Sequence, residues 1–164
     1  MRRPRTKKQA DRATDARIQK AYGITLEERD KLDDSNDEKC WICGRPPVNV
    51  RLSVDHDHAW KKVKVESHQF KPVGTFGGAA GGQKLWWISS AIYNGMLYQI
   101  EAPKKAEAVR VVKKKLKRAS VRGLLCQFCN RGLRYYRDTP EILKNAAKYL
   151  ENFAAGKTQE RLEK

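Results

Sequence analysis

The four cysteines of the chain form two short pairs, Cys40–Cys43 and Cys126–Cys129, each with two residues between its members. Two such pairs supply four thiolates to one tetrahedral zinc ion, and a site closed by four thiolates leaves no position for a substrate. The 82 residues between the pairs exceed the common spacing of about 15 to 20. Loop closure costs free energy only logarithmically with length, so this separation is tolerable. The pattern predicts structural zinc (Zn2+), with four unrelated buried cysteines as the alternative.

Polar residues beside the cysteine pairs offer the side chains that a catalytic site needs. Asp55, His56 and His58 follow the first pair, and Asn130 directly follows the second. A hard cation such as Mg2+ prefers oxygen ligands, which Asp55 and Asn130 can supply. His56 could take a proton from a water that attacks phosphorus, and His58 could hydrogen-bond the phosphate. Two histidines in a loop can also be solvent-exposed or bind a second zinc ion, and the residues alone leave this open.

The charge of the chain indicates a polyanionic partner. Its 164 residues include 35 Lys and Arg against 19 Asp and Glu, a net charge of +16. Nucleic acid is the favoured partner, with a membrane surface as the rival. No apolar run approaches the roughly 18 residues of a spanning helix, and the basic start is followed by no apolar signal-peptide segment. We therefore expect a soluble, cytoplasmic protein, in which cysteines bind metal in preference to forming disulfides.

Amphipathic helices are expected on both sides of the predicted site. Apolar positions recur along residues 9–22, and Gly23 ends that helix. The sequence Thr25-Leu26-Glu27-Glu28 is a capping box that starts a second, short helix. Thr139-Pro140 starts the last helix, with the threonine as N-cap and the proline at N1, and Gly156 ends it.

Strands are expected where the chain reaches each polar cluster. Residues 48–54 alternate apolar and polar side chains and end at Asp55. Residues 121–125 form a second strand that leads to Cys126, and a short helix is expected to start at residues 129–131.

Residues 59–121 differ in composition from their surroundings, with 13 Lys and Arg against three Glu and a net charge of +10. Strands are predicted at residues 62–66, 85–93 and 96–100, and Asn94-Gly95 is a type I′ hairpin turn. Residues 74–82 are rich in glycine and predict a flexible hairpin loop.

A basic helix is expected to follow, from Pro103 to about Arg118. Its predicted apolar face consists of Ala106, Val109, Val112 and Leu116. Eight basic residues and Glu107 cover most of the remainder. These basic side chains could simply form a solvated face over a small core. The charge favours the alternative, in which they contact DNA.

Four segments resemble the phage recombination endonuclease VII family in order, spacing and residue type. They are Tyr22–Thr25, Cys40–Gly44, Val54–His58 and Val121–Asn130. The resemblance covers about residues 20–58 and 119–152. It implies an α+β fold with a ββα-metal (His-Me finger, HNH-like) nuclease core, a structural four-cysteine zinc site and flanking helices.

The resemblance also implies roles for the polar residues. The ligands of a catalytic Mg2+ or Mn2+ fall on Asp55 and Asn130, the general base on His56 and the phosphate-contacting histidine on His58. Family members cleave branched DNA, including Holliday junctions, and are typically homodimers. Branched DNA and a second copy of the chain are therefore the expected partners, in the bacterial host cytoplasm if a phage encodes the protein.

The sequence departs from the family in the connection between its two matching parts, which is usually a short turn. The expected organisation is a basic arm and helix at residues 1–22, a nuclease core at 23–58 and 119–156, an inserted basic module at 59–118 and a polar tail at 157–164. The module weakly resembles the small three-stranded-sheet DNA-binding modules of integrase arms. The basic residues expected to contact DNA are Arg110, Lys113, Lys114, Lys115, Lys117, Arg118, Arg122 and Arg131.

Three functions compete at this point. The first is an endonuclease that cleaves branched DNA such as junctions and flaps. The second is a sequence-preferring HNH endonuclease or nickase of the homing or restriction type. The third is a zinc-supported DNA-binding protein without activity, which the set of Asp55, His56 and Asn130 disfavours.

Overall fold

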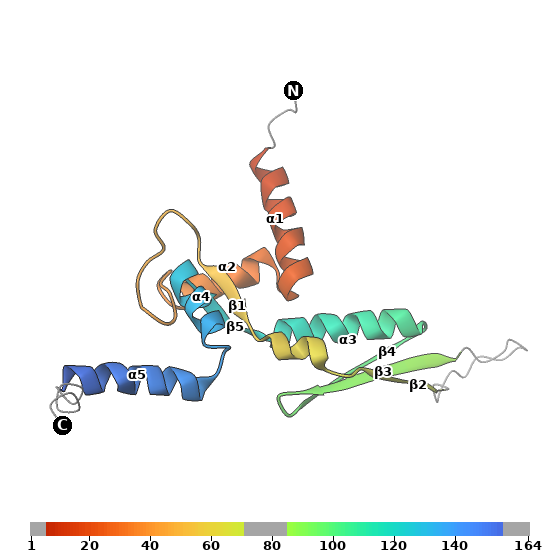
Figure 1. The fold of residues 1–164 in the computed structure, drawn as a ribbon. Coiled ribbons are helices and arrows are strands. Elements are labelled where there is room, and N and C mark those ends of the chain that lie inside the picture. The colour runs from red at the N-terminus through yellow and green to blue at the C-terminus, as the bar shows by residue number, and fades with distance from the viewer. Residues whose placement is uncertain (1–5, 71–84, 156–164) are drawn as a thin grey trace, which may run out of the picture.

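Two short strands from distant parts of the sequence form the centre of the fold. In this computed structural model, which describes residues 6–70 and 85–155, β1 (Ser53–His56) pairs antiparallel with β5 (Val121–Leu125). The long segment between these strands leaves and returns at the same ribbon (Figure 1). Helices surround the ribbon, and the chain is an α+β protein.

Two N-terminal helices, both predicted from the sequence, pack against this ribbon. α1 (Lys7–Tyr22) ends at Gly23, whose φ of +76° is the left-handed conformation that glycine adopts without strain. α2 (Leu26–Asp34) begins with the predicted capping box, in which Thr25 and Glu28 each accept a hydrogen bond from the other's backbone N–H. The buried side chains of this first core are Ile18, Ile24, Cys40, Leu52, Val54, Leu124 and Leu125.

The segment between α2 and β1, residues 35–52, is a loop, so the strand predicted at residues 48–54 is wrong over most of its length. Val48 and Val50 are 79% and 65% exposed and therefore do not form a buried strand face. Asn49 between them has a φ of +63°, which interrupts an extended backbone.

A buried arginine fixes the point where this loop enters β1. Arg29 of α2 is 4% exposed and donates from Nη2 to the Leu52 carbonyl oxygen at 3.2 Å. Its Nη1 pairs with Asp33 at 2.7 Å and with Asp30 at 2.9 Å. A buried guanidinium is stable only when paired in this way, so the contact joins α2 to the start of β1.

Between β1 and β5 the chain forms a separate small module of one sheet and one long helix. Its elements are η1 (His58–Lys62), β2 (Glu66–Phe70), β3 (Trp86–Tyr93), β4 (Met96–Ala102) and α3 (Lys105–Ala119). The strands form an antiparallel sheet in the order β2-β3-β4, and α3 packs on it. At the turn of the β3–β4 hairpin, Asn94 and Gly95 both have positive φ, as the predicted type I′ turn requires.

Two predictions for the module need correction. The first strand lies at residues 66–70 and not at 62–66, because Val63 and Val65 pack against the module core outside the sheet. The apolar face of α3 contains Ala108 in place of Ala106, which is exposed. The glycine-rich residues 74–82 lie outside the described part of the chain.

Two further helices follow β5. α4 (Gln127–Tyr135) starts earlier than expected, with Cys126 as its N-cap. α5 (Pro140–Ala154) begins at the predicted Thr139-Pro140 and projects from the ribbon on the side opposite the module (Figure 1). Its apolar residues, among them Leu150, are largely exposed. Gly156, predicted to end it, lies outside the described residues. Among the described helices, none has the length and apolar character to cross a membrane.

Candidate active site and zinc-binding cluster

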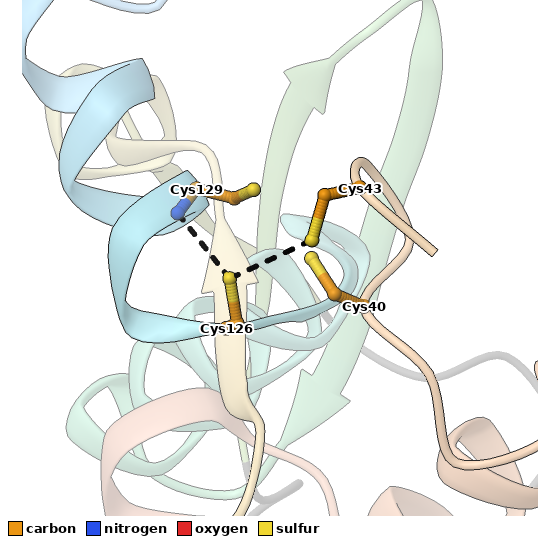
Figure 2. A group of neighbouring side chains, drawn as sticks. All are labelled: Cys40, Cys43, Cys126 and Cys129. Carbon is orange, nitrogen blue, oxygen red and sulfur yellow. Dashed lines mark hydrogen bonds between the residues drawn. The ribbon is translucent and has the colours of Figure 1, made fainter. Parts of the chain in front are cut away.

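The four cysteines lie together, as their spacing predicts. Their Sγ atoms are all within 4.8 Å of one another, and the side chains converge from two separate segments (Figure 2). Cys40 and Cys43 come from the loop after α2, whereas Cys126 and Cys129 come from the start of α4. The Sγ atoms of Cys43 and Cys126 are 3.9 Å apart, close to the ~3.8 Å edge of a tetrahedron with Zn–S bonds of about 2.3 Å. The cluster can therefore bind one zinc ion.

The surroundings give the thiols of this cluster unequal proton affinities. Burial acts to raise the pKa of Cys40, but hydrogen bonds from neighbouring backbone N–H groups, Cys43 first, outweigh it and lower that pKa to about 6. For Cys129, burial and hydrogen bonds among the clustered thiols raise the pKa above its usual range. One thiolate thus forms readily, and a bound cation would favour the deprotonation of the others.

A close approach between Trp41 and Gly123 holds the first cysteine pair against β5. The backbone N–H of Trp41 donates to the Leu124 carbonyl oxygen at 3.1 Å. A Cβ atom on Gly123 would lie 2.8 Å from the Trp41 ring, so a larger residue would push the ring and its loop away from the strand. The sequence shows Gly123 within a strand but does not reveal what approaches it.

The four polar residues predicted for catalysis line one pocket of about 650 Å³. Asp55 and His56 come from the end of β1, His58 from the start of η1, and Asn130 from α4. The other residues that line the pocket are Tyr22, Ser53, Val54, Arg122, Gln127, Arg131, Arg134 and Asp138. The structure therefore brings together the polar residues that follow the two cysteine pairs.

Asp55 is 7% exposed and is held by a two-pronged contact with Arg122. Arg122 donates from Nε to Oδ2 at 2.7 Å and from Nη2 to Oδ1 at 3.0 Å. The pairing of β1 with β5 skips Arg122, so this residue occupies a bulge, a device that redirects a side chain. Nη2 also reaches Asp138 at 3.2 Å. An ionised carboxylate has about four acceptor positions, so Asp55 retains capacity for a cation.

The two histidines lie side by side in the pocket. Their ring centroids are 4.4 Å apart, and the Tyr22 ring stands edge-on to His56 at 5.2 Å. Burial lowers the pKa of His56, nearby His58 lowers it further, and Asp55 opposes both effects. The neutral imidazole, which this shift favours near pH 7, is the form that accepts a proton.

Asp57, between the two histidines, makes its side-chain contacts with the module between β1 and β5. Its Oδ1 accepts from the Ala59 N–H at 2.8 Å and its Oδ2 accepts from the Tyr93 hydroxyl at 2.8 Å. Burial raises the pKa of Asp57, but these two hydrogen bonds together with nearby Arg122 and His58 outweigh burial and lower it overall. Sequence reasoning missed Tyr93, because nothing in its neighbourhood marks it as more than a core aromatic.

The basic residues predicted to contact DNA fall into two groups. Those on α3 are Arg110, Lys113, Lys114, Lys115, Lys117 and Arg118, and those at the pocket are Arg122 and Arg131. Two of the α3 side chains make contacts within the protein. Lys117 Nζ donates to the Lys20 carbonyl oxygen at 2.8 Å, and Arg118 pairs with Glu28. The other four on α3 are exposed.

The comparison with known families identifies a match. The sequence model of the recombination endonuclease VII family matches residues 15–66 and 96–152, which make up most of the chain. No curated protein and no solved structure matches it. The matched segments contain the cysteine cluster and the four polar pocket residues, and they leave out residues 67–95, which hold most of β2 and all of β3. The chain belongs to the recombination endonuclease VII family.

Proposed function

We propose that the protein is a metal-dependent endonuclease that hydrolyses phosphodiester bonds in branched DNA such as Holliday junctions and flaps. Its family implies a nuclease that acts on branched DNA in recombination. The observation that carries the proposal is the pocket that gathers Asp55, His56, His58 and Asn130 with three arginines. Hydrolysis of a phosphodiester needs these kinds of group: oxygen ligands for a cation, a proton acceptor and donors for a phosphate.

We further propose that β1, β5 and α4 form the ββα-metal core of a His-Me finger nuclease. The two strands are antiparallel, and α4 follows β5 directly. In this arrangement the catalytic core consists of residues 23–58 and 119–156, and residues 59–118 form the inserted module. The zinc ion in the cysteine cluster is structural, because its four thiolates leave no coordination position for DNA.

Asp55 and Asn130 are the residues that would hold the catalytic Mg2+ or Mn2+. A carboxylate and an amide oxygen suit a hard cation, and both side chains open into the same pocket. When bound, such a cation stabilises the negative charge that develops on the phosphate and leaving-group oxygens. Arg122 fixes the orientation of the Asp55 carboxylate through two hydrogen bonds.

His56 is the proposed general base and His58 the proposed phosphate contact. His56 lies at the end of β1, next to Asp55, and its lowered pKa keeps the ring neutral and able to accept a proton from water. His58 is more exposed than His56 and can donate a hydrogen bond to a phosphate oxygen of the bound strand. Arg131 and Arg134 at the pocket rim add positive charge for the DNA backbone.

DNA contact by the module is proposed for α3 and not for its sheet. The strands β2, β3 and β4 contain no Lys or Arg, although Glu66 and Glu101 lie on them. With two glutamates and no lysine or arginine, these strands offer the DNA phosphates no cationic contact. α3 carries the exposed Arg110, Lys113, Lys114 and Lys115, so backbone contacts through this helix are favoured.

A homodimer is the proposed assembly. The exposed apolar side chains of α5, with Leu150 and Phe153 each 65% exposed, support it because such a face gains free energy when it is covered. Light scattering of the purified protein tests this directly, and a monomer at micromolar concentration would rule the dimer out.

The deciding experiment compares cleavage of a four-way junction, a flap and a linear duplex of the same sequence. Each is incubated with Mg2+, with Mn2+ and with EDTA. We expect cleavage of the branched substrates that requires the divalent cation, with the linear duplex cut far more slowly. A linear duplex cut at one sequence, with the junction ignored, would instead assign a sequence-preferring HNH nuclease. Tight binding without cleavage of any substrate would refute an enzymatic role.

A further inference from the structure

Tyr93 connects the inserted module to the catalytic segment. It is the last residue of β3, it is 5% exposed, and its hydroxyl donates to Asp57 Oδ2 at 2.8 Å. Tyr93 lies in residues 67–95, which the family's sequence model does not match. The contact therefore joins Asp57, which the family pattern covers, to a part of this chain that the pattern does not describe.

Asp57 is well placed to transmit this contact to the two histidines. It lies between His56 and His58 in the sequence, and its other carboxylate oxygen accepts from the Ala59 N–H at 2.8 Å, which makes it the N-cap of η1. Its own backbone N–H donates to the Ser120 carbonyl oxygen at 2.9 Å. With both carboxylate oxygens and the N–H engaged, the backbone on either side of Asp57 has one favoured orientation.

A second contact holds the segment just after His58. Trp60 of η1 packs against the module core formed by Ala91, Tyr93, Val112 and Leu116. The Lys117 ammonium also lies 5.5 Å from the centroid of the Trp60 ring. His58 is thus flanked by two residues, Asp57 and Trp60, that are both anchored in the module.

Tyr93 does not take part in the chemistry itself. Neither Tyr93 nor Asp57 lines the pocket that holds the catalytic residues. Burial, followed by the hydrogen bond to Asp57, raises the pKa of Tyr93 to about 12, so the phenol stays protonated and remains a donor. A group that remains protonated and outside the pocket acts on the reaction only through the residues it contacts, and the Tyr93 hydroxyl contacts Asp57.

We infer that Tyr93 is a positioning residue for the catalytic histidines: through its hydrogen bond to Asp57, the inserted module holds His56 and His58 in their reactive orientation. This inference rests on the proposed nuclease function and deepens it. The module is then part of the catalytic apparatus as well as a carrier of positive charge. Reactions of this kind are sensitive to small displacements, since a shift of about 1 Å can cost on the order of 100-fold in rate.

The test substitutes Tyr93→Phe, which removes the hydroxyl and keeps the buried ring. The matched control is Tyr98→Phe, the same chemical change on β4, at a partly buried residue of the same module core. We expect Tyr93→Phe to lower kcat for junction cleavage about tenfold to 100-fold, with KM and DNA affinity within about twofold of wild type. Tyr98→Phe should change none of these quantities by more than about twofold.

A kcat for Tyr93→Phe equal to that of wild type would overturn the inference. So would parallel losses of kcat, DNA affinity and thermal stability, which indicate a merely structural contact. Asp57→Asn and the double variant Tyr93→Phe/Asp57→Asn separate the two cases further, because residues that act through one contact are non-additive. The double variant should be no slower than Asp57→Asn alone, and additive losses would contradict the shared contact.

A second readout does not depend on activity. The chain has three histidines, so the ring carbon–proton correlations of His56, His58 and His68 can be resolved by NMR. Tyr93→Phe should shift the signals of His56 and His58, whereas His68 on β2 serves as an internal reference. Unshifted signals would overturn the inference. If the wild-type protein cleaves no DNA, the proposed function falls, and the NMR result still decides whether Tyr93 orders these rings.

Discussion

At the scale of single residues, the proposed reaction depends on His56 accepting a proton. Its ring is half-buried between Tyr22 and His58, and both burial and His58 lower its pKa. His56→Ala should reduce the cleavage rate by about 100-fold or more, which is the usual contribution of a general base, and should leave DNA affinity within about twofold. Single-turnover cleavage and a DNA-binding titration measure the two effects separately.

His68→Ala is the matched control for this substitution. His68 is exposed on β2 and does not line the pocket, so its loss should affect neither rate nor binding. Thermal unfolding of both variants shows whether the contact between His56 and Tyr22 contributes to stability. A His56→Ala protein that cleaves junctions within about tenfold of wild type would exclude this residue as the base.

At the scale of elements, Glu28 links the start of α2 to the end of α3. It accepts from the Thr25 N–H at 2.8 Å and pairs with Arg118. The hydrogen bond from Thr25 is the largest cause that lowers the pKa of Glu28, and Arg118 adds to it. Because the folded-state pKa is lowered, the stabilisation is present above the unfolded pKa of about 4.3 and is lost as the pH falls below that value.

Glu28→Gln should therefore destabilise the protein by about 0.5 to 1 kcal/mol at pH 7, and the difference from wild type should disappear as the pH falls through the lowered pKa of Glu28. Glutamine keeps the cap geometry and loses the charge. Glu27→Gln is the control, because Glu27 forms only an exposed pair with Lys31 and should cost at most about 0.5 kcal/mol. Urea unfolding at several pH values measures both differences. A Glu28→Gln loss that is the same at pH 7 and pH 3 would contradict the assignment.

At the scale of the whole molecule, local patterns predicted the elements whose signals are contained in the sequence itself. The capping box at Thr25 and the turn at Asn94-Gly95 were confirmed because turn and cap chemistry acts over four residues or fewer. The strand at residues 121–125 was confirmed as well. The cysteine spacing likewise predicted the cluster that the structure shows.

Features that depend on distant partners could not be predicted in this way. The alternation at residues 48–54 indicates a strand, but Val48 and Val50 have no facing layer and remain exposed. The hydrogen bond between Arg122 and Asp55 joins residues 67 positions apart in the sequence. The hydrogen bond between Tyr93 and Asp57 joins residues 36 positions apart. Their geometry arises from the bulge in β5 and from the module's packing, which no local pattern encodes.

Zinc is expected to hold the two distant segments of the core together. The apparent free energy of zinc binding to four-ligand peptides, about 10 to 16 kcal/mol, is as large as the stability of a typical domain. Cys126→Ser should therefore abolish zinc binding and cause unfolding or aggregation, as should strong chelation of the wild-type protein. Metal analysis and circular dichroism measure these outcomes. A folded, metal-free Cys126→Ser variant with wild-type thermal stability would show that the cluster is not a structural zinc site.

The net charge of +16 is expected to act through α3 when the protein binds DNA. Each phosphate contact contributes about 0.9 to the slope of log affinity against log salt concentration. Replacing the exposed Lys113 and Lys114 by glutamine should therefore flatten that slope by up to about 1.8. The control replaces Lys144 and Lys148 on α5, which removes the same charge from a helix on the opposite side of the ribbon. Equal slope changes in the two variants would mean that α3 has no specific contact with the DNA backbone, and that the lysines act only through net charge.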